Sequence, residues 1–299
     1  MHKSALEFGK SFFDVYAAGM PDGLVIDIGA QDVNGSLKDL CPEHLQYCGV
    51  DFVEAKGVDV VLTDPYQLPF EDNSVDIVVC SSCFEHSELF WLLFLEILRI
   101  LKPSGLFYLN APSNGYIHRY PVDCWRLYPD AGRALVTWGQ RSGFDPVLLE
   151  SFIGDMAGST QSGEGWNDFI AVFLKSADQL SLYSTRITDE LKSFSNGLRA
   201  GSDVFVQAHE RSQDQRVIES LGMRLHEEQV SLRQVQESAL KEAQDRQREF
   251  DELAKRHAVL REQAESLHAE LTAMRATFSW RITSSLRTLR GKFGPGARP

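Results

Sequence analysis

The sequence predicts an α/β domain built on an open, mostly parallel sheet, followed by a long α-helical coiled coil. Short apolar runs alternate with helical segments through residues 1–176, at the spacing expected for βαβ units. Between residues 218 and 274, apolar side chains recur at alternating steps of three and four. The composition changes along the chain as well, because all five cysteines lie between Cys41 and Cys124 and residues 147–294 contain no proline.

The expected strands are short apolar runs closed by glycine, polar residues or proline. They fall at residues 24–29, 47–52, 58–63, 75–80 and 106–110, and two further runs, 147–152 and 169–174, can pair as a closing hairpin. Helices are expected at 89–101, before Pro103, and at 131–141, before Gly143. In such sheets ligands bind beyond the carboxyl ends of the strands, near the point where the strand order reverses.

Charge divides the chain into three unlike parts. The formal net charge of −12 is the sum of −13 over residues 1–176, −5 over 177–274 and +6 over 275–299. An acidic globular part argues against binding to nucleic acid, and no nucleic-acid partner is expected. No apolar run reaches 18 residues, and Glu7, Lys10 and Asp14 interrupt the N-terminus, so neither a transmembrane helix nor a signal peptide is expected.

The cysteines indicate a reducing compartment. They are scattered, without the spacing of a metal site, and we expect free thiols in the cytoplasm. Cys80 and Cys83 form the one close pair. Because Cys80 ends an apolar strand and does not begin a helix, redox chemistry is disfavoured.

Polar residues at the carboxyl ends of the first four strands are candidates for a nucleoside site. Asp51 follows Asp27 by 24 residues, and an acid at the end of the second strand can bind both hydroxyls of a ribose. Gly29 begins the turn after the first strand, Asp64 begins a segment that suits an adenine edge, and Ser81 follows the fourth strand. The alternative is that these residues only form turns and caps.

Residues 20–176 resemble the class I S-adenosylmethionine-dependent methyltransferases of the small-molecule type (type 11). The resemblance rests on four motifs in the usual order: Val25-Ile26-Asp27-Ile28-Gly29, Tyr47-Cys48-Gly49-Val50-Asp51, Asp64-Pro65-Tyr66-Gln67-Leu68-Pro69-Phe70 with Asp76-Ile77-Val78, and Phe84-Glu85-His86 with Leu98-Arg99-Ile100-Leu101-Lys102-Pro103-Ser104-Gly105. It implies a Rossmann-like doubly wound sheet and S-adenosyl-L-methionine as cofactor. The cofactor contacts that it implies come from Asp27, Gly29, Ala30, Gln31, Asp51, Phe52, Asp64, Pro65, Tyr66 and Ser81.

The loop after the first strand departs from the family pattern. The usual Gly-x-Gly-x-Gly is replaced by Gly29-Ala30-Gln31-Asp32-Val33-Asn34-Gly35. Glycine allows backbone to approach a ligand closely, which a pyrophosphate needs most. The departure therefore disfavours a nicotinamide or flavin cofactor more than a methyl donor. Asn34 and Gly35 are expected to supply the tight turn.

Two segments after strand ends contain candidates for a general base, which a hydroxyl acceptor needs. His118 is the first choice, with Asp123 orienting it or acting alone, and His86 ranks third. The aromatic and charged side chains around His118 suit sugar recognition, and the expected substrate contacts are Tyr116, Arg119, Tyr120, Trp125 and Arg126. The alternative is a surface loop with internal salt bridges. No metal is expected, because Glu85, His86, His118 and Asp123 lack dense ligand spacing.

The coiled-coil prediction rests on one unbroken heptad frame. Its more apolar column contains Ile218, Leu225, Leu232, Ala239, Leu253, Leu260, Leu267 and Met274, interrupted by Arg246. This pattern favours a homo-oligomer or pairing with a partner helix over a single solvated helix.

The pattern of the last segment, residues 275–299, predicts a basic amphipathic helix. Phe278, Ile282, Leu286, Leu289 and Phe293 fall on one face, and six arginine or lysine residues with no acid supply the charge. This combination is typical of a helix that binds an anionic membrane surface, with a tail that binds RNA or a partner as the alternative. The string from Ser279 to Arg287 also resembles a tail found on bacterial surface-polysaccharide glycosyltransferases.

Together these features predict a cytoplasmic enzyme on the inner face of the inner membrane. We expect a methyltransferase domain at 1–176, a helical linker at 177–210, a coiled coil at 211–277 and a membrane-associating tail at 278–299. The expected reaction is O-methylation of a sugar in a lipid-linked surface polysaccharide such as O-antigen, and methylation of the terminal sugar would cap the chain. A glycosyltransferase is a candidate partner. The alternatives are an inactive scaffold with this fold and a methyltransferase for a small diffusible metabolite.

Overall fold

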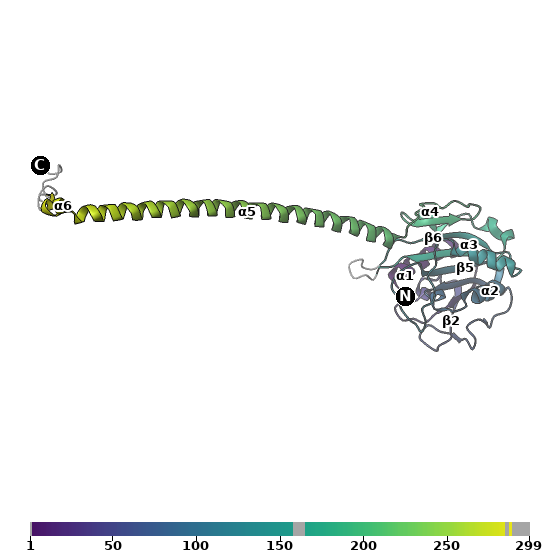
Figure 1. The fold of residues 1–299 in the computed structure, drawn as a ribbon. Coiled ribbons are helices and arrows are strands. Elements are labelled where there is room, and N and C mark those ends of the chain that lie inside the picture. The colour runs from purple at the N-terminus through teal and green to yellow at the C-terminus, as the bar shows by residue number, and fades with distance from the viewer. Residues whose placement is uncertain (1, 158–164, 285–286, 289–299) are drawn as a thin grey trace, which may run out of the picture. The chain divides into compact units, whose positions relative to one another are not determined.

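A computed structural model describes residues 2–157, 165–284 and 287–288 of the chain (Figure 1). Its described part divides into two units, residues 1–220 and 221–299. The first unit contains an eight-stranded sheet with the order β3-β2-β1-β4-β5-β7-β6-β8. It is the predicted Rossmann-like doubly wound fold, because β1 to β5 are parallel and the strand order reverses between β1 and β4.

The strands follow the apolar runs closely. They are β1 (Gly23–Ile28), β2 (Leu45–Asp51), β3 (Val60–Val61), β4 (Val75–Ser81), β5 (Leu101–Pro112), β6 (Val147–Ile153), β7 (Asp168–Leu174) and β8 (Ser195–Arg199). The predicted closing hairpin is present, since β7 pairs antiparallel with both β5 and β6. The third strand is only two residues long, and β5 begins directly where the preceding helix ends.

Helices cover both faces of the sheet. Alternating side chains of β1 show this, because Ile26 packs with α2 (Phe90–Ile100) and α3 (Ala131–Arg141), whereas Val25 packs with α1 (Lys3–Phe12). The side chains of Val25 and Ile26 are both fully buried, so neither face of this strand needs polar residues. A π-helical turn, Phe13–Ala17, continues α1 and adds Tyr16 to the second core.

The segment predicted as a helical linker, residues 177–210, is part of the first unit, and the prediction is wrong in this respect. It contains a 3-10 helix at Ala177–Leu182, the short α4 (Ile187–Glu190) and β8, which pairs with β6. The buried carboxylate of Glu150 on β6 anchors it, accepting hydrogen bonds from the backbone N–H groups of Ile187 (2.6 Å) and Thr188 (3.0 Å). These tertiary contacts hold a segment that the sequence pattern alone did not place in the sheet.

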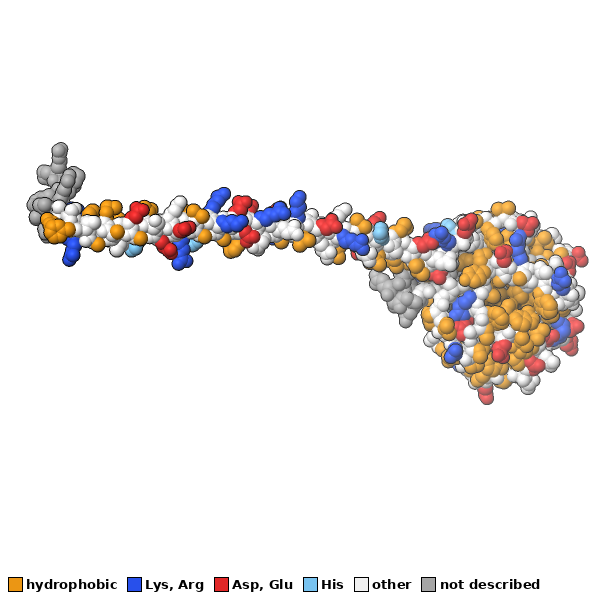
Figure 2. Space-filling model, viewed as in Figure 1, with side chains coloured by type: hydrophobic (Ala, Val, Ile, Leu, Met, Phe, Trp, Pro, Cys, Tyr) orange, Lys and Arg blue, Asp and Glu red, His pale blue; other side chains and the backbone are white. Residues whose placement is uncertain are grey.

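Helix α5 (Gln213–Ala276) matches the predicted helical segment of residues 211–277 in position and length. Its 64 residues correspond to about 95 Å at 1.5 Å per residue. Apolar side chains of the predicted seam are exposed along it, and charged residues of both signs lie between them (Figure 2). The long helix is therefore present, and its assembly into a coiled coil stays a prediction.

The predicted membrane tail is described only in part. Helix α6 (Phe278–Ile282) begins it, and the guanidinium carbon of Arg287 lies 3.7 Å from the centre of the Trp280 ring. Residues 285–286 and 289–299, which include Leu286, Leu289 and Phe293, lie outside the described residues. None of the helices in the described part of the chain is both long enough and apolar enough to cross a membrane.

Candidate functional site

The turn after β1 lies at the point where the strand order reverses. Gly29 has φ = +82°, and a Cβ atom built on it would lie 2.8 Å from the Cβ atom of Cys83, which follows β4. The N–H groups of Gly29 and Ala30 both donate to the carbonyl oxygen of Val50 on β2. The turn therefore joins the ends of three neighbouring strands, and only glycine fits at its first position.

The rest of this loop forms a second tight turn at the predicted place. Gly35 has φ = +114°, and its N–H donates to Oδ1 of Asp32 at 2.9 Å. The other carboxylate oxygen of Asp32 accepts from Lys56. The predicted turn near Asn34 and Gly35 is present, and Gln31 lies half-buried before it.

Asp27 lies beneath this edge of the sheet. Its carboxylate is almost fully buried and accepts a 2.6 Å hydrogen bond from the hydroxyl of Tyr47 on β2. Burial raises the pKa of Asp27 to about 6, and the Tyr47 hydrogen bond opposes that rise. The motif indicated Asp27, but the role of Tyr47 in holding it was not predicted.

Asp51 ends β2 with its carboxylate fixed by the backbone that follows. Its Oδ1 atom accepts hydrogen bonds from the N–H groups of Phe52 at 2.7 Å and Val53 at 3.3 Å. The side chain of Phe52 is 52% exposed beside it. An oriented carboxylate next to an exposed aromatic ring fits the predicted recognition of a ribose and its base.

The predicted adenine segment is also fixed locally. Oδ1 of Asp64 accepts from the N–H of Tyr66 at 2.8 Å, and the hydroxyl of Tyr66 accepts from the N–H of Leu89 at 3.1 Å. Pro65, between them, is exposed. The three residues thus form a short turn after β3, and a hydrogen bond connects this turn to the residue that precedes α2.

Buried polar groups without partners mark the ends of β4 and β5. Ser81 and Asn110 are paired residues of these strands, and within the described residues neither the Ser81 hydroxyl nor the Asn110 amide has a hydrogen-bond partner. Buried polar atoms are rarely left in this state unless water or a ligand satisfies them. The Ser81 hydroxyl and the Asn110 amide therefore suit binding of a polar ligand at this edge. Asn110 was not among the predicted residues, although it ends an apolar run.

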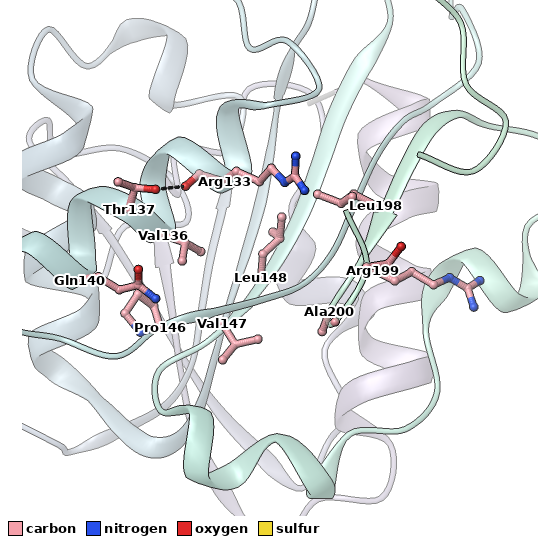
Figure 3. A pocket seen from close by; sticks show the side chains of 12 residues that line it. Arg133, Val136, Thr137, Gln140, Pro146, Val147, Leu148, Leu198, Arg199 and Ala200 are labelled. Carbon is pink, nitrogen blue, oxygen red and sulfur yellow. Dashed lines mark hydrogen bonds between the residues drawn. The ribbon is translucent and has the colours of Figure 1, made fainter. Parts of the chain in front are cut away.

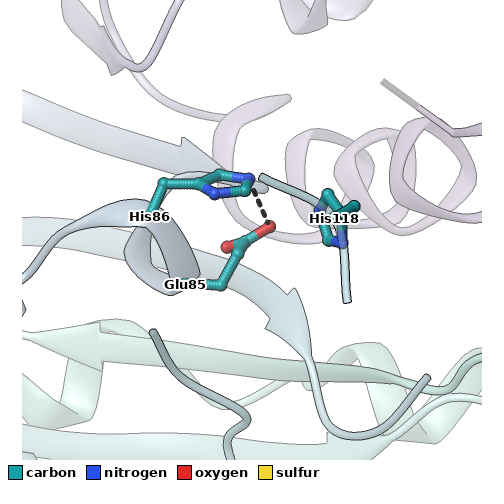
Figure 4. Close-up of side chains that lie close together, drawn as sticks. All are labelled: Glu85, His86 and His118. Atoms are coloured by element: carbon teal, nitrogen blue, oxygen red, sulfur yellow. Dashed lines mark ion pairs between the residues drawn. The ribbon is translucent and has the colours of Figure 1, made fainter. Parts of the chain in front are cut away.

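Glu85, His86 and His118 come together beside the same edge (Figure 4). One ligand atom from each side chain lies within 4.8 Å of the others, and Oε1 of Glu85 is 3.7 Å from Nε2 of His86. The rings of His86 and His118 are nearly perpendicular, with centres 5.0 Å apart. Glu85 and His86 lie in a 3-10 helix, Phe84–His86, that directly follows Cys83.

The environment sets the charge states of this cluster. Burial raises the pKa of Glu85 to about 8, so the carboxyl group is more readily protonated than an exposed one. Burial lowers the pKa of His86, whose Nδ1 atom lies 2.5 Å from the carbonyl oxygen of Val122. A neutral His86 that donates from Nδ1 has Nε2 available as an acceptor.

Asp123 is engaged with Arg126. The guanidinium group donates to both carboxylate oxygens, at 2.5 and 2.9 Å, and the N–H of His118 donates to Oδ2 at 2.7 Å. The Arg126 hydrogen bonds lower the pKa of Asp123 to about 2, which disfavours Asp123 as an independent base. Its Oδ2 atom lies 3.6 Å from Nδ1 of His118, so it remains placed to orient that ring.

The predicted substrate residues divide into exposed and anchored side chains. Tyr116, Arg119 and Tyr120 are exposed. Trp125 packs against Phe90 and Trp91, and its Nε1–H donates to the carbonyl oxygen of Ser87. Arg126 also donates to the backbone of the loop, at the carbonyls of Tyr116 and Trp125. The alternative prediction, a loop held by internal salt bridges, therefore applies to Arg126. The exposed side chains remain candidates for substrate contact.

The loop after β5 is anchored at both ends. Asn114 and Asn167 exchange hydrogen bonds of 2.6 and 2.9 Å, which join the loop to the start of β7. The N–H of Cys124 donates to the carbonyl oxygen of Glu85 at 2.7 Å. These contacts hold His118 over Glu85 and His86.

A separate cavity of about 450 Å³ lies between α3, β6 and the end of β8 (Figure 3). Its lining includes Arg133 and Arg199, whose charges are paired with Asp203 and Asp189. None of the predicted site residues lines it.

A family model matches part of the first unit. Residues 29–109 match the model described as "Methyltransferase domain". The matched segment begins at the Gly29 turn and ends beside Asn110, so it contains most of the candidate cofactor edge. The match supports S-adenosyl-L-methionine, the cofactor predicted from the motifs.

Curated proteins and solved structures are similar to parts of this chain. The chain is 30% identical over 146 residues to "Probable methyltransferase PMT21" of Arabidopsis thaliana, covering 47% of this chain and 22% of that protein. It is 31% identical over 96 residues to the phthiotriol/phenolphthiotriol dimycocerosates methyltransferase of Mycobacterium tuberculosis, covering 31% and 32% of the two chains. The structure of the YcgJ protein from Bacillus subtilis aligns with a TM-score of 0.42 at 15% identity, covering 58% of this chain and 99% of that one. The chain spans less than half the length of the curated relatives it matches.

Proposed function

We propose that the protein is an S-adenosylmethionine-dependent methyltransferase that methylates a hydroxyl group of a sugar. The observation that carries the proposal is the position of the Glu85, His86 and His118 cluster. It follows Cys83, which contacts the Gly29 turn, so groups able to hold or move a proton lie beside the candidate cofactor edge. A hydroxyl acceptor needs such groups, because it must lose its proton during transfer.

The cofactor supplies a methyl group on a sulfonium centre, which is already a good leaving group. The remaining work of the chain is to place the acceptor oxygen in line with that group and to remove its proton. His118 remains the first choice for the base, since its side chain is 37% exposed and faces the buried pair. His86 is less exposed, at 15%, and the Val122 carbonyl fixes its ring.

A sugar is the acceptor class that the loop suits best. Tyr116 and Tyr120 are 47% and 60% exposed, and Arg119 lies between them in the sequence. Aromatic rings can cover the apolar face of a sugar while arginine donates to its hydroxyls. A free amine or a planar aromatic acceptor would have less need of this combination.

The second unit supports a substrate at a membrane surface. The segment after residue 274 has six basic residues and no acidic one, and each basic residue near an anionic surface contributes about 1 kcal/mol. We therefore propose a lipid-linked surface glycan of the O-antigen type as substrate, on the cytoplasmic face of the inner membrane. In this proposal α5 pairs with a second copy, and methylation of a terminal sugar caps the chain.

The direct test combines cofactor binding with methyl transfer. Titration calorimetry of the full chain with S-adenosylmethionine should show one site, and labelled methyl groups should then appear on glycan acceptors. His118→Gln should keep cofactor binding and lose at least 100-fold in turnover, whereas His44→Gln, at an exposed position outside the cluster, should match the wild type. Transfer only to a small soluble metabolite would contradict the substrate, and no cofactor binding would contradict the activity.

A further inference from the structure

We propose that Glu85, His86 and His118 bind one divalent first-row transition-metal ion, such as Zn²⁺ or Mn²⁺. The inference deepens the proposed function, because the ion would lie beside the reacting hydroxyl. Two imidazoles and one carboxylate form a recurrent donor set for such ions, which commonly retains open positions for water or substrate.

The three side chains are already close to binding geometry. Nitrogen and oxygen ligands lie about 2.0–2.2 Å from Zn²⁺, so two ligand atoms on one ion are at most about 4.4 Å apart. The ligand atoms here all lie within 4.8 Å of one another, and the Glu85 to His86 distance is already 3.7 Å. Their separations therefore exceed the limit for one ion by at most about 0.4 Å, and Figure 4 shows the three side chains lying close together.

The carboxyl group of Glu85 is the second observation that points to a cation. Its side chain is 1% exposed, and Oε2 has no hydrogen-bond partner within the part of the chain that the structure describes. Burying such a group without a partner is unfavourable, and buried charges in proteins are paired or bind metals. Arg126 is the nearby cation, but its guanidinium donates to Asp123 and to backbone carbonyls.

An outer carbonyl holds the imidazole of His86, and a carboxylate lies near that of His118. Ligating histidines usually donate their other ring N–H to a carbonyl or a carboxylate, which fixes the ring. The Nδ1 atom of His86 faces the Val122 carbonyl, and that of His118 faces the Asp123 carboxylate at 3.6 Å. Arg126 fixes Asp123 in turn. A solvated pair of histidines on a mobile loop would lack these supports.

The ion would serve the acceptor half of the site. It would polarise a sugar hydroxyl that approaches an open position and favour loss of its proton to water. With the ion bound, His118 acts as a ligand, and this role replaces the general-base role proposed for it above. The acceptor oxygen then bonds to the methyl carbon while the carbon–sulfur bond breaks toward sulfur, leaving S-adenosylhomocysteine. A vicinal diol is the sugar unit that fits two open positions on one ion.

The test is metal binding by the full chain, read independently of turnover. Protein freed of metal by a chelator is titrated with Co²⁺, followed by visible absorption, and with Zn²⁺, followed by calorimetry. We expect one site with visible bands of a nitrogen- and oxygen-ligated Co²⁺. Glu85→Gln and His118→Asn should each weaken binding at least 10-fold. S-adenosylmethionine binding and unfolding curves show whether each variant is folded.

Glu88→Gln is the matched control, because Glu88 is exposed three residues from Glu85 and is not part of the cluster. It should bind the ions as the wild type does. Absence of one-to-one binding, or equal affinity of the Glu85 and Glu88 variants, would overturn the proposal, since thiols or surface groups would then account for any binding. Metal binding without any methyl transfer would leave the site standing and contradict the proposed function.

Discussion

Replacing Gly29 with alanine should damage the cofactor edge far more than an ordinary glycine substitution. The left-handed backbone at φ = +82° costs about 1–2 kcal/mol for a residue with a Cβ atom. The new Cβ atom would also lie 2.8 Å from Cβ and 3.0 Å from Sγ of Cys83, and such overpacking typically costs about 1–3 kcal/mol. Gly29→Ala should therefore lower the free energy of unfolding by about 2–5 kcal/mol in total.

Gly143→Ala separates the two contributions. Gly143 has a similar φ of +92°, but a Cβ atom there meets nothing within 4 Å. This variant should lose only the backbone contribution of about 1–2 kcal/mol. It should bind S-adenosylmethionine normally, because it follows α3, away from the predicted cofactor residues.

Urea unfolding measures the stability of both variants, and calorimetry measures cofactor affinity. To relieve the contact, Cys83 or the turn that donates to Val50 must move, and we expect at least 10-fold weaker binding by Gly29→Ala. Equal losses of stability in the two variants would refute the close packing of Gly29, after β1, against Cys83, after β4. Unchanged cofactor affinity in Gly29→Ala would refute the placement of the cofactor at this turn.

Three further predictions test the cofactor edge and the long helix. The pKa of Asp27 is raised to about 6, so the folded state loses roughly 3 kcal/mol relative to the unfolded state as the pH rises from about 4 to about 6. Asp27→Asn should lack this part of the loss, and pH-dependent urea unfolding of both proteins checks it. Asp51→Asn should weaken S-adenosylmethionine binding roughly 10- to 100-fold in calorimetry, because a hydrogen bond to a charged group contributes about 1.5–3 kcal/mol, whereas exposed Asp22→Asn should not. Leu260→Asp, in the predicted seam of α5, should weaken self-association more than 10-fold in analytical ultracentrifugation, while Val259→Asp, outside the seam, should not; a monomeric wild type would contradict the homo-oligomer.

The sequence predicted those parts of the fold whose signals are local. The buried strands appear as continuous apolar runs, and α3 begins and ends at the predicted residues, Ala131 and Arg141. Strand β8 was missed because its residues, Ser195 to Arg199, lack an apolar run and join the sheet through pairing with β6. Helix α1 was not predicted, although Phe12 at its end is fully buried in the core.

The positions of the candidate cofactor residues were predicted for the same reason. Gly29 directly follows β1, Asp51 is the last residue of β2 and Asp64 lies three residues after β3, so their placement at this edge follows from the strand order. Their partners were harder to predict. Tyr47 acts on Asp27 across two strands, and the unpartnered Asn110 is recognised only when its burial is known.

The acceptor half depends on contacts between distant segments. Glu85 and His118 are 33 positions apart in the sequence, and hydrogen bonds to Asn167 and to the Glu85 carbonyl bring the loop over the 3-10 helix. No local periodicity encodes this approach, so the sequence suggested the residues without their arrangement. The match to the methyltransferase model ends at residue 109, before this loop begins. Since the matched segment carries most of the candidate cofactor residues and the loop carries the groups proposed to face an acceptor, we expect residues 113–127 to select the proposed substrate.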